Sequence, residues 1–201
     1  MFPMLIVACG ESPPDAAAGS AAGVEAAQAT LALTATATAA DCASTTPGPP
    51  AQGCVSGALA CGATVAGTTL GGDSAWDDEF YAAAFCFPPG DSHSGSERVY
   101  TLTAPTNTEV TIQLSSSCAD LDLVAVEWNY DGACPTARHL VPECEGDSKR
   151  GGDGIVRLQT FTPRAYLIGV DGKNGAVGAF ELTVSCKPLR SQEERSKALP
   201  R

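Results

Sequence analysis

The sequence lacks features that would place the protein in several common classes. No segment approaches the about 20 consecutive apolar residues that a membrane-spanning helix needs. Lys and Arg number 12 against 23 Asp and Glu, for a net charge of −11. Because phosphate backbones repel so acidic a protein, nucleic acid is not an expected partner. Histidine is scarce as well, since His93 and His139 are the only two that could act as catalytic bases.

Cysteine, in contrast, is abundant. The nine cysteines are spread along the chain, which is typical of proteins that fold in an oxidising compartment. Their spacing does not match the short C-x-x-C type of a zinc knuckle, so disulfides are favoured over zinc. Sequence alone leaves many pairings open. The pairs we expect are Cys134–Cys144 and Cys61–Cys86, which close local loops, and then, by elimination, Cys118–Cys186 and Cys42–Cys54.

The ninth cysteine lies at the end of a short apolar N-terminus. Ile6-Val7-Ala8-Cys9 resembles the lipobox of bacterial lipoproteins, in which the cysteine becomes lipid-modified. No Lys or Arg precedes Cys9, and the apolar run is shorter than that of a signal peptide. A coincidental apolar N-terminus is the alternative. The resemblance implies a truncated signal in 1–9, a lipid anchor at Cys9, and a cell-envelope lipoprotein in the outer membrane, facing the periplasm or the exterior.

Composition divides the remainder into three parts. Residues 10–53 are mostly Ala, Thr, Gly, Ser and Pro, with too few large apolar groups to offset their ordering entropy, so we expect a flexible linker. Residues 54–187 hold short runs rich in β-branched and aromatic residues, separated by turn residues, and 188–201 form a charged tail. No sustained helical period occurs in the middle part, which predicts an all-β, antiparallel, disulfide-rich β-sandwich. The expected strands are 63–70, 79–87, 97–104, 109–115, 121–128, 154–161, 165–170 and 178–186.

Three blocks carry a family resemblance: SGSERVYTLTAP at 94–105, SCADLDLVAVEW at 117–128 and AYLIGVDGKNGAVGAFELTVSC at 165–186. In this order and spacing they resemble the bacterial pre-peptidase C-terminal domain family over about residues 58–186. Ser96 stands where that family has proline, and the loops 71–95 and 129–153 are long. The resemblance implies a non-catalytic sandwich of jelly-roll type on a secreted bacterial protein, in a family with calcium-, collagen- and polysaccharide-binding members.

The third block also has a local interpretation. Its strand 165–170 ends at Asp171-Gly172, and Gly175 and Gly178 follow. Glycines suit the positive φ angles of a tight turn, so 165–186 predicts a hairpin. Asp171 would accept hydrogen bonds from the amides of that turn.

Gly90-Asp91-Ser92, followed by His93, looks at first like the nucleophile of a serine hydrolase. The same triplet recurs at 72–74 and 146–148, always in a polar loop, so it indicates loop composition. A nucleophile also needs a base at hydrogen-bonding distance and an oxyanion hole. We therefore expect no catalytic residues and treat a small serine hydrolase as the most distant alternative.

The acids and aromatics offer two further hypotheses. An acidic loop supplies carboxylates that Ca²⁺ prefers, although without EF-hand spacing. Trp76, in the same loop, is expected to be an exposed ring available for binding, while Trp128 is expected to pack inside. Asp122 is expected to bond loop amides near a sheet edge. The candidate calcium ligands are Asp73, Asp77, Asp78 and Glu79.

Together these features predict a non-catalytic lipoprotein whose β-sandwich is a structural or binding module for a surface protein, a glycan or a polymer. The alternative is a calcium-dependent module that binds carbohydrate or protein. Apart from calcium, no cofactor is expected.

Overall fold

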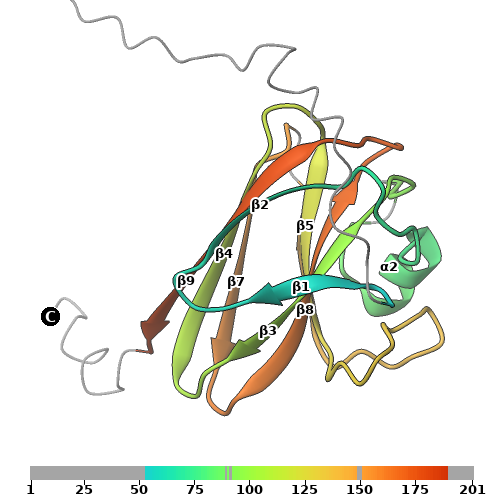
Figure 1. The fold of residues 1–201 in the computed structure, drawn as a ribbon. Helices are drawn as coiled ribbons and strands as arrows, with labels where there is room; N and C mark the ends of the chain where they lie inside the picture. Colours follow the sequence, from blue (N-terminus) through green and yellow to red (C-terminus); the bar gives the residue numbers. More distant parts are fainter. Residues whose placement is uncertain (1–52, 89, 91, 149–150, 190–201) are drawn as a thin grey trace, which may run out of the picture. The chain divides into compact units, whose positions relative to one another are not determined.

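The computed structural model describes residues 53–88, 90, 92–148 and 151–189, in which two β-sheets pack face to face (Figure 1). The predictions for Cys9, Cys42 and the linker up to residue 52 lie outside these residues. None of the helices described is long and apolar enough to cross a membrane. The elements are β1 Val55–Leu59, β2 Thr64–Thr68, α2 Asp78–Ala84, β3 Arg98–Ala104, β4 Thr108–Ser115, β5 Leu121–Glu127, β6 Cys144–Asp147, β7 Gly154–Thr160, β8 Arg164–Gly172 and β9 Ala179–Pro188.

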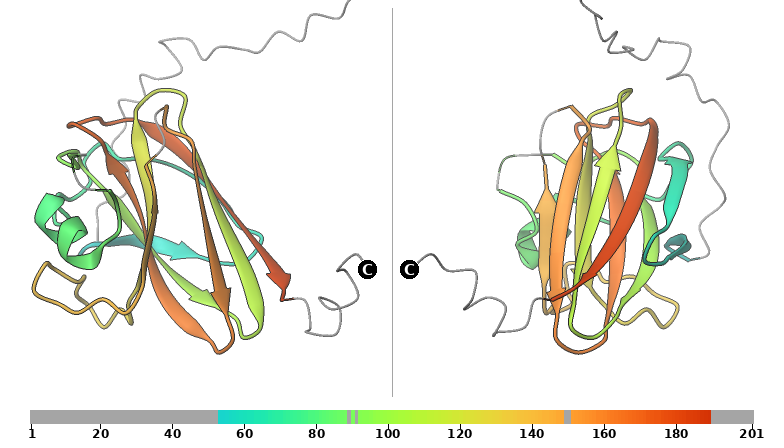
Figure 2. Two further views of the ribbon diagram at one scale, coloured as in Figure 1. Left: turned by 180° about the vertical axis from the view of Figure 1, so that it is seen from behind. Right: turned by 90° about the vertical axis from the view of Figure 1, so that its left-hand side faces the viewer.

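The five-stranded sheet has the order β1-β3-β8-β5-β6, and the four-stranded sheet has the order β2-β9-β4-β7. Among the described strands all pairs are antiparallel except β1 with β3. The two sheets form separate layers (Figure 2). This arrangement confirms the all-β sandwich expected from the sequence.

The main core lies between the sheets, because alternate residues of each strand point inward. In β4, Val110, Ile112 and Leu114 have no exposed surface, and the residues between them face outward. Leu102 of β3 and Leu158 of β7 are each 1% exposed in the same core. Burying a side chain of this size stabilises the fold by about 1.5–3 kcal/mol.

A second core lies on the outer face of the five-stranded sheet, where α2 covers it (Figure 1). Trp76, Phe80 and Tyr81 pack there on Val124 and Leu167. Trp76 is 1% exposed, so the prediction of an exposed binding ring was wrong. The reason is its surroundings: its ring fills the space over the bare backbone of Gly169, where an added Cβ would lie 2.7 Å from the indole, and its Nε1–H donates to the Pro135 carbonyl.

The run 79–87 is not a strand, because its first six residues belong to α2, and this corrects the predicted elements. The Asp77 carboxylate accepts a hydrogen bond from the Phe80 N–H at 2.9 Å and caps the helix. Three consecutive alanines, 82–84, then favour helix, and the left-handed backbone of Phe85 ends it. At seven residues the helix is too short to show a periodic pattern in the sequence.

The disulfide pairs differ from all four expected pairs. The structure joins Cys54 to Cys134, Cys61 to Cys186 and Cys86 to Cys144, and Cys118 is also disulfide-bonded. The first two predicted pairs assumed that neighbours in sequence are neighbours in space, and the other two followed from them by elimination. Cys61 instead precedes β2, which pairs with β9, and so meets Cys186 near the end of β9.

The predicted hairpin over 165–186 was also wrong. β8 belongs to the five-stranded sheet and β9 to the other, so the chain between them crosses from one layer to the next. Asn174 and Gly175 do take positive φ angles, of 51° and 80°, in that crossing. Gly172 is needed for another reason: a Cβ there would lie 1.8 Å from the Ala176 carbonyl oxygen.

Candidate functional site: a cavity beside helix α2

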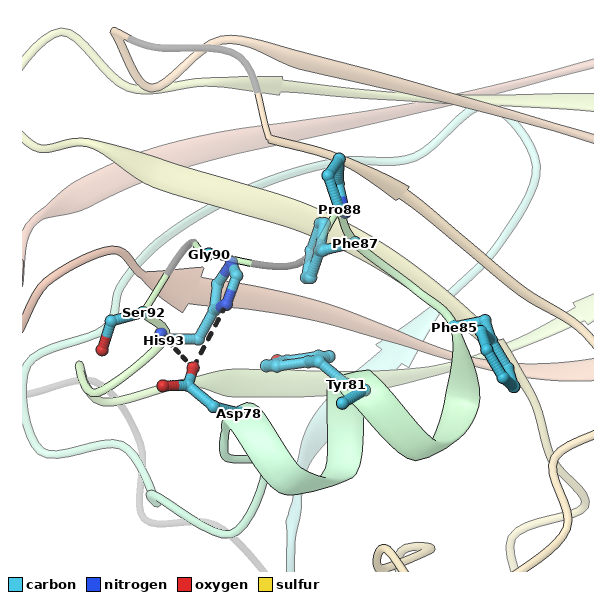
Figure 3. A pocket seen from close by; sticks show the side chains of 9 residues that line it. Asp78, Tyr81, Phe85, Phe87, Pro88, Gly90, Ser92 and His93 are labelled. Carbon is cyan, nitrogen blue, oxygen red and sulfur yellow. Dashed lines mark hydrogen bonds and ion pairs between the residues drawn. The ribbon is translucent and has the colours of Figure 1, made fainter.

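A cavity of about 530 Å³ lies between α2 and the segment that leads from the helix to β3. Figure 3 shows its side chains, with Phe87 and Pro88 on one side, Phe85 at the far end of the helix, and Asp78 at its beginning. This volume is in the range of small-molecule sites in proteins. The lining residues used below are Asp78, Tyr81, Phe85, Phe87, Ser92 and His93.

Phe85 is an exposed part of the cavity wall. Its side chain is 87% exposed, although it is large and apolar. Its backbone has a φ of 57°, an angle that a bulky residue seldom adopts. The N–H of the next residue, Cys86, donates to the Tyr81 carbonyl at 3.1 Å and closes the helix end in this conformation. The fold thus holds an aromatic ring at the rim of the cavity, where it contributes nothing to the core.

The floor of the cavity is a rigid group of rings. The Phe87 and His93 rings stack with centroids 4.4 Å apart, and Tyr81 meets both edge-on, at 4.9 and 4.7 Å. Phe87 also packs on Gly146 of β6, where a Cβ would lie 2.4 Å from its ring. The Cys86–Cys144 disulfide ties the same segment to β6. The cavity is therefore preformed rather than assembled by loops alone.

His93 lies between two carboxylates and is 3% exposed. Its Nε2 is 2.8 Å from Oδ2 of Asp122, and its Nδ1 is 3.7 Å from Oδ1 of Asp78. The His93 backbone N–H also donates to that Asp78 oxygen at 2.7 Å. The prediction that Asp122 bonds loop amides at a sheet edge was wrong. Its strand β5 lies inside the sheet, between β8 and β6, and its carboxylate faces His93 under the α2 layer.

Two further buried acids, Asp171 and Glu97, interact with Tyr81, whose ring contacts this histidine. Asp171 accepts a hydrogen bond from the Tyr81 hydroxyl at 2.5 Å, and Glu97 accepts from the backbone N–H groups of Ala75 and Trp76 at 2.7 and 3.2 Å. One oxygen of each acid, and one of Asp122, accepts no hydrogen bond from the described residues. Carboxylates lose their hydration in such surroundings.

The protonation of these groups follows from their burial. Desolvation raises the pKa of Glu97 to about 7, although the N–H groups of Ala75 and Trp76 lower it. Desolvation likewise raises the pKa of Asp171 to about 6, opposed by hydrogen bonds from the Tyr81 hydroxyl and the Gly172 backbone. Asp171 was predicted to bond the amides of a hairpin turn, but its partners are the Tyr81 hydroxyl and the backbone of Gly172, the last residue of β8. Desolvation, and then Asp171, raise the pKa of Tyr81.

The acids proposed for calcium take separate positions. Asp77 caps α2, Asp78 holds His93, and Asp73 accepts from the Ser74 N–H at 2.9 Å. Glu79 lies exposed in the first turn of the helix. Within the part of the chain that the structure describes, no group of three or more His, Cys, Asp or Glu side chains is arranged to hold a metal ion. Calcium binding by this loop would require these acids to rearrange.

Sequence reasoning missed the His93–Asp122 contact, because 29 residues separate the partners. One signal was available. Asp122 alternates in phase with Val124 and Val126, which pack under α2, so it shares their buried face. A buried carboxylate requires a polar partner, and a histidine is a natural one.

No family model matches the chain, and no curated protein matches it. Among solved structures, the chain is similar to the pre-peptidase C-terminal domain of a collagenase from Bacillus anthracis, with a TM-score of 0.40 and 13% identity over 65% of this chain and 96% of that one. It is also similar to PliG of Aeromonas hydrophila, a periplasmic inhibitor of g-type lysozyme, with a TM-score of 0.36 and 15% identity over 62% and 85% of the two chains. The first of these structures is a domain of the family that the three sequence blocks resemble.

Proposed function

We propose that the β-sandwich is a non-catalytic binding module and that the cavity beside α2 is its ligand site. The observation that carries this proposal is the exposed Phe85 ring, held on a left-handed backbone at the rim of a preformed, largely apolar cavity. Exposed apolar surface at the edge of a concave site is typical of ligand-binding grooves. A concave apolar site with a few polar groups is also the usual form of a ligand pocket.

The environment of His93 supports a non-catalytic function. A histidine that activates a serine needs one ring nitrogen directed at the hydroxyl. Here both ring nitrogens are directed at carboxylates, Asp122 and Asp78, although Ser92 is the adjacent residue. The histidine supports the cavity wall instead. A hydrolytic activity of the protein that Ser92→Ala abolishes would overturn this part of the proposal.

We place this module in the cell envelope, carried on the lipid anchor at Cys9 and the linker 10–53. Three disulfides among the described residues support an oxidising compartment. A surface protein, a glycan or a polymer would supply the group that enters the cavity. Detergent partitioning tests the anchor, since the wild type should enter the detergent phase and Cys9→Ala should not.

A ligand-detected NMR screen of small soluble aromatic and aliphatic fragments tests the binding site itself. Phe85→Ser should weaken the binding of the fragments by about fivefold or more, because it removes the exposed wall of the cavity. Phe161→Ser is the matched control, since Phe161 is 63% exposed but does not line the cavity, and it should leave binding unchanged. Fragments that bind equally to all three proteins would contradict the proposal.

A further inference from the structure

We propose that the cavity beside α2 takes a small organic cation, an ammonium group on a short apolar body. This inference rests on the proposed function and names the chemical class of its ligand. It follows from the combination of aromatic faces and negative charge around one cavity.

The aromatic part comes from three rings among the residues that line the cavity, Tyr81, Phe85 and Phe87 (Figure 3). Tyr81 and Phe87 form its floor, with centroids 4.9 Å apart at an angle of 66°, and Phe85 stands at the rim. The face of an aromatic ring attracts a cation through the ring quadrupole. Several rings around one space form the cage that proteins use for substituted ammonium groups.

The charged part is negative. Asp78 is on the wall, with 56% of its side chain exposed, and no Lys or Arg is among the described residues that line the cavity. A negatively charged ligand would be repelled by this carboxylate. A neutral ligand would gain no charge–charge attraction from this carboxylate, yet its binding would remove part of the hydration of Asp78.

His93 is the one lining group that can become positive, and its neighbours outweigh it. It contacts the carboxylates of Asp122 and Asp78, at 2.8 and 3.7 Å, so a protonated His93 and its two partners still carry a net charge of −1 when both acids are ionised. Behind the wall, Asp122 and Asp171 each have an oxygen without a hydrogen bond from the described residues. Their charge acts through a medium of low dielectric constant and strengthens the negative potential at the cavity.

Isothermal titration with choline and with its neutral carbon isostere, dimethylbutanol, tests the inference on the full chain. The two probes have the same shape and differ in charge. Choline should bind about tenfold more tightly than the alcohol at low salt, and added salt should weaken choline alone. Equal affinity for the two probes would overturn the inference, yet it would leave the proposed binding site intact if Phe85→Ala weakened both.

Two variants separate the charge from the rings. Asp78→Asn keeps an oxygen for the His93 N–H and should weaken choline about threefold or more without affecting the alcohol. Phe85→Leu keeps an exposed apolar side chain but removes the ring, and it should also weaken choline selectively. Phe161→Leu is the control for an exposed phenylalanine elsewhere. Choline affinity that neither cavity variant changes would contradict the assignment of the cation to this cavity.

Discussion

Asp122 and Asp171 lie directly opposite each other on the neighbouring strands β5 and β8, and neither has any exposed surface. Like charges in such a pair repel, so the sheet alone would not tolerate them. Each receives one hydrogen bond from the layer that covers the sheet, Asp122 from His93 and Asp171 from Tyr81. The two donors, His93 and Tyr81, line the cavity, so the polar cluster that stabilises the sheet also fixes the binding site.

The Tyr81 hydroxyl should stabilise the protein mainly when Asp171 is ionised. Tyr81→Phe removes that donor and should lower the free energy of unfolding by about 1–3 kcal/mol at pH 8. The loss should be smaller at pH 5, because the pKa of Asp171 is about 6 and the acid is then mostly protonated. Urea unfolding at the two pH values measures this. Tyr166→Phe, which loses a 3.2 Å bond to the partly buried Glu143, should have a smaller effect, and equal losses would contradict the account.

Glu97 should make the protein less stable as the pH rises. Its pKa is about 7 in the folded chain against 4.5 as its ordinary value, so the folded state binds the proton more tightly. Its favourable contribution is complete below about pH 4.5 and is lost as the pH rises through 7. This difference corresponds to about 3 kcal/mol.

Glu97→Gln cannot ionise and should flatten the change of melting temperature between pH 5 and 8. Glu109→Gln, on the part-buried surface of β4, is the control and should leave the profile as it is. A wild-type stability that rises over this range would show that Glu97 is not the group that dominates it.

The disulfides should differ in what they protect. Replacing Cys86 and Cys144 by serine frees the Phe87 segment from β6, and should cost about 2–4 kcal/mol of stability and weaken ligands of the cavity. Replacing Cys61 and Cys186 should cost a similar or larger amount, since the loop is longer, but leave those ligands bound. Thermal unfolding and titration of both double variants check this. If neither double variant changed the affinity of the cavity for its ligands, the Cys86–Cys144 disulfide would not shape the cavity.

The bare backbone of Gly169 should be essential for the packing of Trp76. In Gly169→Ala the new Cβ would lie 2.7 Å from the indole and 2.8 Å from Val124, and the strain should cost about 1–3 kcal/mol. Gly57→Ala is a matched change in the same sheet, where the closest contact is an ordinary 3.4 Å. Urea unfolding should show the first protein destabilised and the second close to the wild type.

Calcium should not stabilise the protein, because the acids of the 73–79 loop are used separately, as helix cap and as hydrogen-bond partners. Scanning calorimetry in millimolar calcium and in chelator should give the same melting temperature. A clear rise with calcium would restore the calcium-dependent alternative and require these acids to rearrange.

The sequence predicted those parts of the molecule that depend on local patterns. Strands such as β4 are visible because one face packs on the core and the other meets solvent, so apolar residues alternate. The short edge strand β6 has no such pattern, since it is only partly buried or exposed along its length. Helix α2 was missed because its cap at Asp77 and its end at Phe85 depend on single residues.

The candidate site depends on contacts that no local pattern encodes. Asp122 is 29 residues from His93, and Tyr81 is 90 residues from Asp171. The disulfides were misjudged for the same reason, since Cys61 and Cys186 are 125 residues apart. The burial of Trp76 follows from a glycine on a distant strand. The composition shows that the chain is acidic and has two histidines. Which of the acids are buried is decided by the fold.

Amide chemical-shift mapping of the labelled protein, titrated with choline, tests the central claim most directly. We predict that the shifts concentrate in α2 and in the residues after it that line the cavity, Phe85, Phe87, Gly90, Ser92 and His93, and that Phe85→Leu reduces them. Shifts concentrated instead at the second hollow, around Trp128 and the exposed Leu140, or spread evenly over the surface, would contradict the account.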